Sequence, residues 1–260
     1  MSPLFEITSI TTYPVKGFAG QSHQSIMACK GAVLPGDRAY ALSSGTKASQ
    51  MADKHSWMKK AHFLQAMALS ELAELSLTFD DASKQLCLSH QGNIIFDGHL
   101  DDPAAEHRLC NVMASYLDWP DDLPQPRLFH YQTGGLTDTK TAYVAFGNQA
   151  SMTDFGAKAG INDDERRYRL NVMMTGGDAF SETALIGKKA RIGSAEFHFI
   201  EPVGRCAAIE VDPQSAKRQK GLVSQLQRYY DHTDMGIFAT VTKTGTFDVG
   251  DKLTIMDDEC

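Results

Sequence analysis

The sequence predicts a mainly β fold of the α+β class, with a barrel-like arrangement of strands and a few helices. Two observations support this prediction: short apolar and β-branched runs recur along the chain, and glycine-containing turns separate them. The length of 260 residues lies between one large domain and two ordinary ones. We therefore expect two intimately packed subdomains, an N-terminal β-barrel over residues 1–120 and a second barrel-like unit over residues 121–260.

The first half is predicted to contain short strands that end at turn residues. The first strand runs from Leu4 to Tyr13, after which Pro14 and Gly17 mark a loop. Further strands are expected at 25–29, 38–43, 72–79, 85–89 and 93–96. One helix is predicted after Asp102, which can cap it, with Pro103 in its first turn.

The second half is predicted to begin after a connector, because the run from Trp119 to Pro126 contains three prolines. Helices are expected at 149–158 and 215–230. Strands are expected at 168–175, 191–200, 207–211, 237–242 and 252–256, with a turn at 244–246.

The composition is that of a globular protein, with 42% hydrophobic and 22% charged residues. A net charge of −7 gives no support to nucleic-acid binding, which calls for a basic surface. The cysteines show no zinc spacing and fit a reducing compartment; they are Cys29, Cys87, Cys110, Cys206 and Cys260. The N-terminus lacks a secretory-signal pattern, and no apolar run has membrane-spanning length. We therefore expect a cytoplasmic protein that binds neither nucleic acid nor membrane.

The run from Pro202 to Pro213 places a thiol, Cys206, beside the guanidinium of Arg205 and before an apolar segment. Cysteine acts as a nucleophile or metal ligand in its thiolate form, which a neighbouring cation favours. The alternative is that Cys206 is a small buried apolar residue, as unpaired cysteines often are. Cys206 is the first candidate for a catalytic or metal-ligating residue.

Two segments near the N-terminus place a cation beside a glycine. Lys16 precedes Gly17 in a turn, where an ammonium group and backbone N–H groups can meet a phosphate; the alternative is an ordinary surface lysine. Arg38 lies in the run Gly36-Asp37-Arg38-Ala39-Tyr40. Its planar guanidinium suits bidentate binding of a phosphate, and the alternative is a structural ion pair with Asp37.

The run Arg166-Arg167-Tyr168-Arg169-Leu170-Asn171-Val172 is a third candidate. If this run is a strand, Arg169 and Asn171 share one face and can meet one ligand. The arginines then form a local basic pocket for an anionic ligand. Alternatively, together with the acidic residues 163–165, they form a solvated loop of mixed charge.

Together these segments resemble, in order along nearly the whole chain, the MOSC domain and the β-barrel domain that precedes it in amidoxime-reducing components. The run from Trp57 to Phe63 also resembles the family, and we expect it to pack rather than react. MOSC domains also occur in molybdenum cofactor sulfurases. The resemblance implies a molybdenum cofactor, with Cys206 as the catalytic residue and the metal ligand. It also implies a set of cofactor-binding residues: Lys16, Arg38, Arg169, Asn171 and Arg205. Gly17 and Gly204 depart from the family pattern, in which serine is usual at both positions, and this puts two cofactor hydrogen bonds in doubt.

The resemblance leaves three functions open. The first is a molybdenum-dependent oxidoreductase that reduces N-hydroxylated small molecules, with Asp212 or Asp234 assisting proton transfer. Its electrons would come from a separate donor protein, because the sequence lacks the C-x4-C-x2-C spacing of a ferredoxin-type iron–sulfur domain. The second is a sulfur carrier that uses a Cys206 persulfide loaded by a donor protein, since no pyridoxal-phosphate domain is evident. The third is a non-catalytic cofactor-binding protein.

Overall fold

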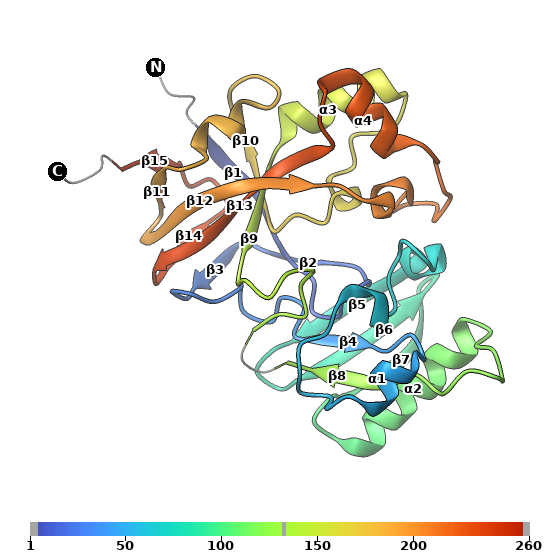
Figure 1. Cartoon of the computed structure of the whole chain (residues 1–260). Helices are drawn as coiled ribbons and strands as arrows, with labels where there is room; N and C mark the ends of the chain where they lie inside the picture. The colour runs from blue at the N-terminus through green and yellow to red at the C-terminus, as the bar shows by residue number, and fades with distance from the viewer. Residues whose placement is uncertain (1–4, 132–133, 257–260) are drawn as a thin grey trace.

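The computed structural model describes residues 5–131 and 134–256, and it confirms the mainly β fold. Figure 1 shows two lobes, one above the other. The upper lobe is built on a curled sheet whose strands follow the order β15-β11-β12-β13-β9-β10-β1-β2. These strands are β1 (Glu6–Thr12), β2 (Gln21–His23), β9 (Val144–Asn148), β10 (Val172–Thr175), β11 (Lys189–Ile192), β12 (Ala195–Gly204), β13 (Asp234–Lys243) and β15 (Thr254–Ile255).

Three smaller sheets complete the strand structure of the described residues. In the upper lobe, β3 (Ser25–Ala28) pairs with β14 (Gly245–Asp248). In the lower lobe, β4 (Tyr40–Leu42) pairs with β8 (Leu128–His130). A meander of β5 (Leu75–Asp80), β6 (Gln85–His90) and β7 (Asn93–His99) lies beside them.

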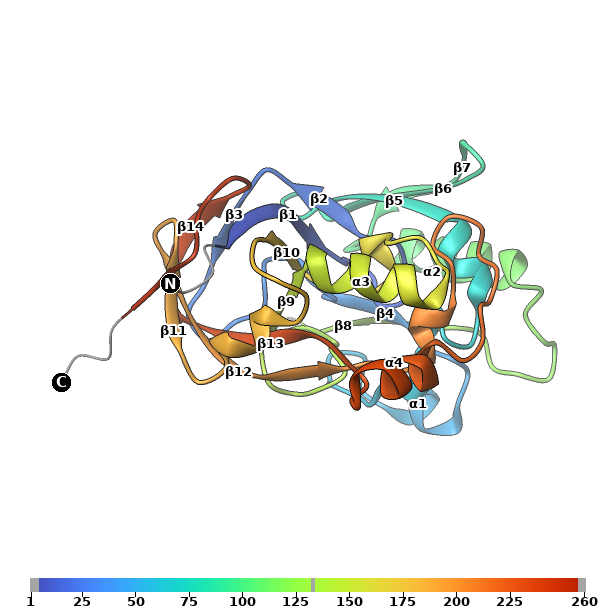
Figure 2. The same ribbon diagram turned by 90° about the horizontal axis from the view of Figure 1, so that it is seen from above.

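Capping side chains mark where the two longest α-helices of the described residues begin. The helix α2 (Pro103–Tyr116) starts at Asp102, whose carboxylate accepts from the Ala104 backbone N–H, as predicted. The helix α3 (Gln149–Ala159) is capped by Asn148 and ends at Gly160 in a left-handed conformation. The others are α1 (Lys47–Met51) and α4 (Leu222–Tyr230). Figure 2 shows α3 and α4 side by side at the end of the large sheet opposite the chain termini.

Short 3-10 helices lie in the connections: η1 (Lys60–His62), η2 (Ser70–Glu74), η3 (Glu165–Arg167), η4 (Ser181–Leu185) and η5 (Ala207–Glu210). Four of them, η1, η2, η3 and η5, carry residues that line the space between the lobes. None of the helices in the described residues is long and apolar enough to cross a membrane.

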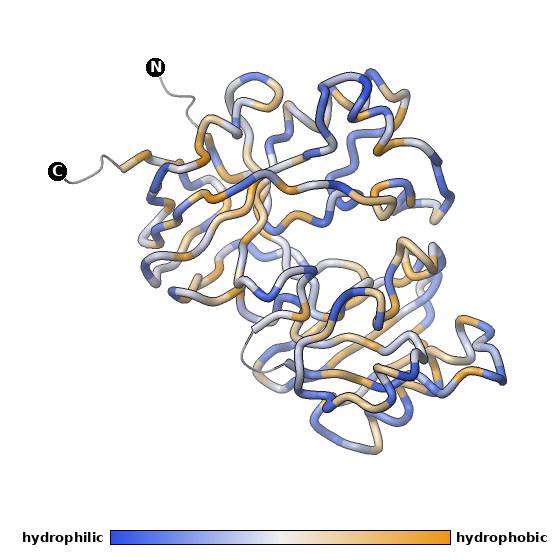
Figure 3. The backbone as a smooth tube through the Cα atoms, viewed as in Figure 1, coloured by the Kyte–Doolittle hydropathy of each residue, from blue (hydrophilic) through white to orange (hydrophobic). Residues whose placement is uncertain are grey.

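Each lobe has its own apolar core, and hydrophobic segments gather along the strands inside both lobes (Figure 3). The core of the large sheet combines Ile7 and Ile10 of β1 with residues of β9, β10, β12 and β13. The lower core packs α2 against the meander. The division into residues 1–120 and 121–260 stays a prediction, and strand pairing crosses it: β1 pairs with β10, and β4 pairs with β8.

The structure corrects several predicted elements. Residues 168–171 are not part of a strand, because β10 begins at Val172. The predicted strand at 191–200 is a hairpin of β11 and β12, and the predicted strand at 207–211 is the 3-10 helix η5. The predicted turn at 244–246 is largely strand β14, and residues 215–221 are not helical. Leu4 and Cys260 lie outside the described residues.

Candidate functional site

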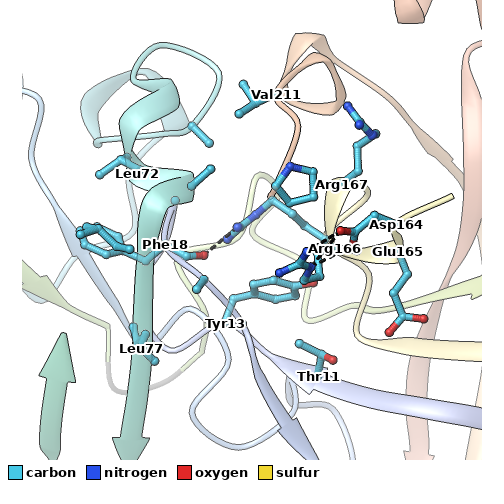
Figure 4. A pocket seen from close by; sticks show the side chains of 18 of the residues that line it. Thr11, Tyr13, Phe18, Leu72, Leu77, Asp164, Glu165, Arg166, Arg167 and Val211 are labelled. Atoms are coloured by element: carbon cyan, nitrogen blue, oxygen red, sulfur yellow. Dashed lines mark hydrogen bonds and ion pairs between the residues drawn. The ribbon is translucent and has the colours of Figure 1, made fainter. Parts of the chain in front are cut away.

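Two cavities of about 610 and 360 Å³ lie between the lobes. Figure 4 shows the larger one, with Leu72 and Leu77 of the lower lobe facing Arg166 and Arg167 of the upper lobe. Both cavities are lined by Gly17, Ala66, Arg167, Arg169, Leu170 and Ala208. The cavities are therefore neighbouring parts of one cleft, and each is large enough for a small ligand.

The smaller cavity brings together all six residues that the sequence singled out. They are Lys16, Arg38, Arg169, Asn171, Arg205 and Cys206. Cys29, Cys87 and Cys110 line neither cavity. Burial raises the pKa of Cys110 to about 11, so this thiol is held in its neutral form. The common location supports the predicted site, while the role of each residue stays a prediction.

Lys16 follows β1 in a tight turn that its own backbone anchors. Its N–H donates to the Tyr40 carbonyl, and the side chain is only 7% exposed. The ammonium group donates to Leu136 O at 2.8 Å and to Asp138 Oδ1 at 2.6 Å. Burial lowers the pKa of Lys16, and Asp138 opposes this effect. Lys16 is thus a buried cation rather than a surface lysine.

Asp138 joins two lysines at the edge of this cavity. Its Oδ1 pairs with Lys16, and its Oδ2 lies 3.1 Å from Lys60 Nζ. Partial burial would raise the pKa of Asp138, but the two ammonium groups hold it well below its usual range. Sequence reasoning did not find Asp138, because the residue lies in a loop with no motif around it.

Arg38 has the structural role that was the alternative to ligand binding. Its Nη1 pairs with Asp37 Oδ2 at 2.5 Å, and Asp37 is 1% exposed. The other oxygen of Asp37 accepts from the Tyr13 backbone N–H at 2.8 Å. Arg38 also donates from Nη2 to the Arg169 carbonyl at 3.1 Å, which joins the two lobes. The residue therefore stabilises the cleft whether or not it also binds a ligand.

Tyr13 holds two guanidinium groups against one ring. The Arg169 guanidinium lies 4.3 Å and the Arg38 guanidinium 4.8 Å from the ring centroid. The Tyr13 hydroxyl donates to Leu170 O at 3.2 Å. Tyr13 lies three residues before Lys16, and the sequence predicted no role for it.

Arg169 and Asn171 do not share a strand face as predicted. Arg169 adopts a left-handed conformation (φ 53°), so the chain turns immediately before β10. Its Nη1 donates across the cleft to Phe18 O at 2.7 Å, and burial lowers its pKa to about 10. Both ends of the Asn171 side-chain amide form hydrogen bonds with the backbone. Its Oδ1 accepts from the Ala145 N–H, and its Nδ2 donates to Thr11 O.

Cys206 is the residue before η5 and is half-buried. The neighbouring Arg205 directs its guanidinium to the carbonyls of Tyr168 (2.6 Å) and Val203 (3.2 Å), and burial lowers its pKa to about 10. The thiol instead receives a contact from Lys60 of η1, whose Nζ lies 3.7 Å from Cys206 Sγ. Burial would lower the pKa of Lys60, but Asp138 and Cys206 together raise it.

Lys60 is a residue that sequence reasoning missed. It lies in the run from Trp57 to Phe63, which resembles the family but was expected to pack rather than react. This resemblance was the sequence signal from which Lys60 could have been found. The structure places its lysine in the cavity beside the thiol.

The other predicted polar residues have local structural partners. Asp212 pairs with the buried Arg167 at 2.9 Å and accepts from Ser215, and it lines neither cavity. Asp234 lies opposite Gly204 in the pairing of β12 with β13 and is likewise outside the lining. Arg166 forms an exposed ion pair with Asp164 at 2.5 Å, which is the mixed-charge alternative.

Comparisons with known proteins give one family match and several similar solved structures. A family model described as "MOSC domain" matches residues 134–254. Among solved structures, the chain is similar to YiiM from Geobacillus stearothermophilus (13% identity, TM-score 0.34, 44% of this chain and 54% of that chain). It is also similar to the YuaD protein from Bacillus subtilis (10% identity, TM-score 0.44, 96% and 94%) and to YiiM from Escherichia coli (12% identity, TM-score 0.34, 45% and 55%).

The match therefore spans about half the length of the two YiiM chains. Among curated proteins, none matches this sequence significantly. The family match covers β9 to β14 and includes Cys206, Arg205, Arg169 and Asn171. Residues 134–254 of this chain therefore match the MOSC domain family, as the sequence resemblance predicted.

Proposed function

We propose that this protein binds a molybdenum cofactor in the cleft, with Cys206 as the protein ligand of the metal, and that it reduces N-hydroxylated compounds. The observation that carries the proposal is the position of Cys206 in one cavity with Lys16, Arg38, Arg169 and Arg205. These residues come from both lobes. A thiol among several cations is suited to an anionic ligand that also contains a soft metal.

The charges of the cavity fit such a ligand. Among the described residues, neither Arg169 nor Arg205 is within ion-pair distance of a carboxylate, and both donate to backbone carbonyls instead. A partly buried guanidinium without a counter-ion carries a desolvation cost that a bound anion would offset.

The metal-ligating groups fit as well. The described residues contain no cluster of three or more His, Cys, Asp or Glu side chains that could hold a metal ion. Cys206 would therefore be one protein ligand of a metal whose other ligands belong to the cofactor itself. When bound, the cofactor supplies the two-electron redox chemistry, and a separate donor protein supplies the electrons.

The chain's own residues would orient the reactants and supply a proton. Reduction of an N–OH group to N–H and water consumes two electrons and two protons. Lys60 Nζ is a proton-bearing group 3.7 Å from Cys206 Sγ, whereas Asp212 and Asp234 line neither cavity. Lys60 is accordingly the better candidate for proton transfer.

The test is the molybdenum content of protein expressed with an intact cofactor pathway. We expect Cys206→Ser to lose the metal and Cys87→Ser to retain it, because Cys87 is half-buried on β6 and lines neither cavity. The loaded wild-type protein should reduce an N-hydroxylated amidine with an artificial electron donor. Equal metal content in the two variants would refute the ligand role.

A second candidate function is sulfur transfer through a Cys206 persulfide. The contact between Lys60 Nζ and Cys206 Sγ favours it, since an ammonium group would stabilise a persulfide anion. Mass spectrometry of protein incubated with a cysteine desulfurase and cysteine distinguishes the two functions. A persulfide on Cys206 together with an absence of bound molybdenum would support sulfur transfer over reduction.

A further inference from the structure

We infer that Tyr143 and Phe238 form an aromatic ledge that selects substrates with a flat aromatic ring; this inference rests on the proposed function. The two rings are stacked, with centroids 4.8 Å apart and planes inclined by 18°. Both rings line the smaller cavity together with Cys206. Both residues are half-buried, so part of each side chain remains open to a ligand.

The large sheet explains why the ledge is there. Phe238 of β13 pairs with Ala145 of β9, and Tyr143 lies immediately before β9. Neighbouring strands thus place the two rings diagonally across one face of the sheet. The face continues with Val203 of β12, which also lines the cavity.

The cavity therefore has two kinds of wall. One is charged, with Lys16, Arg38, Arg169 and Arg205, and suits the anionic cofactor. The other is apolar, with Tyr143, Phe238, Val203 and Ala145, and Met67 of the lower lobe lines the same space. A planar ring can extend the existing stack, and a thioether makes favourable contacts with aromatic rings. An aliphatic substrate would gain neither contact.

Tyr143 also remains a neutral ring under ordinary conditions. Burial, together with the neighbouring Glu201, raises the pKa of its hydroxyl. The ring accordingly contributes through its π face and not as a phenolate.

The experiment compares benzamidoxime with acetamidoxime as substrates of the molybdenum-loaded protein, using an artificial electron donor. We expect wild type to favour benzamidoxime in kcat/KM, and Tyr143→Leu or Phe238→Leu to reduce that preference about three- to tenfold, as one aromatic contact predicts. Tyr229→Leu is the control, because Tyr229 is an exposed tyrosine on α4 that lines neither cavity. Molybdenum content is measured for every variant.

A second readout is independent of turnover. Binding of benzamidine and acetamidine to the loaded protein is measured by ligand-observed NMR, and the leucine variants should weaken only benzamidine binding. Unchanged preferences in both leucine variants would overturn the aromatic ledge while leaving the reductase function intact. Weakened benzamidine binding without turnover of either amidoxime would support the ledge and refute the reductase.

Discussion

Lys60 Nζ and Cys206 Sγ lie 3.7 Å apart, although the two residues are 146 positions apart in the sequence. The contact joins η1 of the lower lobe to the segment before η5 of the upper lobe. The same ammonium group pairs with Asp138, which in turn pairs with Lys16. A chain of four polar residues therefore runs along the edge of the cavity.

We expect Lys60→Met to lower the molybdenum content of the purified protein about threefold. The ammonium group stabilises negative charge at the thiol, but its side chain is 36% exposed, so the effect should be near 0.5–1 kcal/mol. Lys59→Met is the matched control, because Lys59 is exposed and lines neither cavity. If both variants retain equal amounts of metal, the contact has no part in holding the ligand.

Arg38→Ala should destabilise the protein by about 3 kcal/mol, because it leaves Asp37 buried without its cation. Urea unfolding measures the loss. The double variant Asp37→Asn, Arg38→Ala should recover a substantial part of it, since the asparagine oxygen can still accept from the Tyr13 N–H. A double variant as unstable as the single one would show that Asp37 is not the cause. A loss of cofactor from Arg38→Ala can be assigned to ligand binding only after its loss of stability has been measured.

The two glycines that stand where serine is usual should respond differently to replacement. Gly17 has a φ of +89°, and a Cβ there would lie 2.6 Å from Leu64 O, so Gly17→Ser should cost about 2 kcal/mol or more. A Cβ at Gly204 would meet Asp234 Oδ1 at 3.6 Å, an ordinary contact, so Gly204→Ser should stay within about 0.5 kcal/mol of wild type. Thermal unfolding checks both, and similar melting temperatures would contradict the argument.

The free energy of unfolding should fall as the pH rises above the ordinary pKa of a glutamate, because Glu182 is buried. The residue is fully buried, each of its carboxyl oxygens lies 2.9 Å from Ser151 Oγ, and burial raises its pKa. Above about pH 4.5 the unfolded chain releases this proton while the folded chain retains it, so stability declines until the folded pKa is passed. Glu182→Gln should remove this part of the decline.

Urea unfolding of wild type and Glu182→Gln at several pH values between 4.5 and 7 measures the difference. Glu196→Gln is a control, because Glu196 is a glutamate on β12 that pairs with Lys243 near the surface. Parallel stability curves for wild type and Glu182→Gln would contradict a raised pKa for Glu182.

Local sequence signals predicted the elements that depend on neighbouring residues. The helix α2 begins after Asp102 because the cap and Pro103 act within one turn. The strand prediction at 207–211 was wrong because local residues alone did not distinguish two structures. Its apolar residues fit either a strand or a 3-10 helix, and burial of Ile209 among residues of α3 and α4 accompanies the helical form.

Motifs in the sequence indicated which side chains could serve an anionic, metal-containing ligand: one thiol beside an arginine, and cations beside glycines. Which of these side chains meet depends on the folded chain. It gave Arg38 a buried carboxylate partner, turned Arg205 toward backbone carbonyls, and placed Lys60 beside the thiol. The reason is physical: these contacts join residues far apart along the chain, and their distances follow from how the lobes and the large sheet pack.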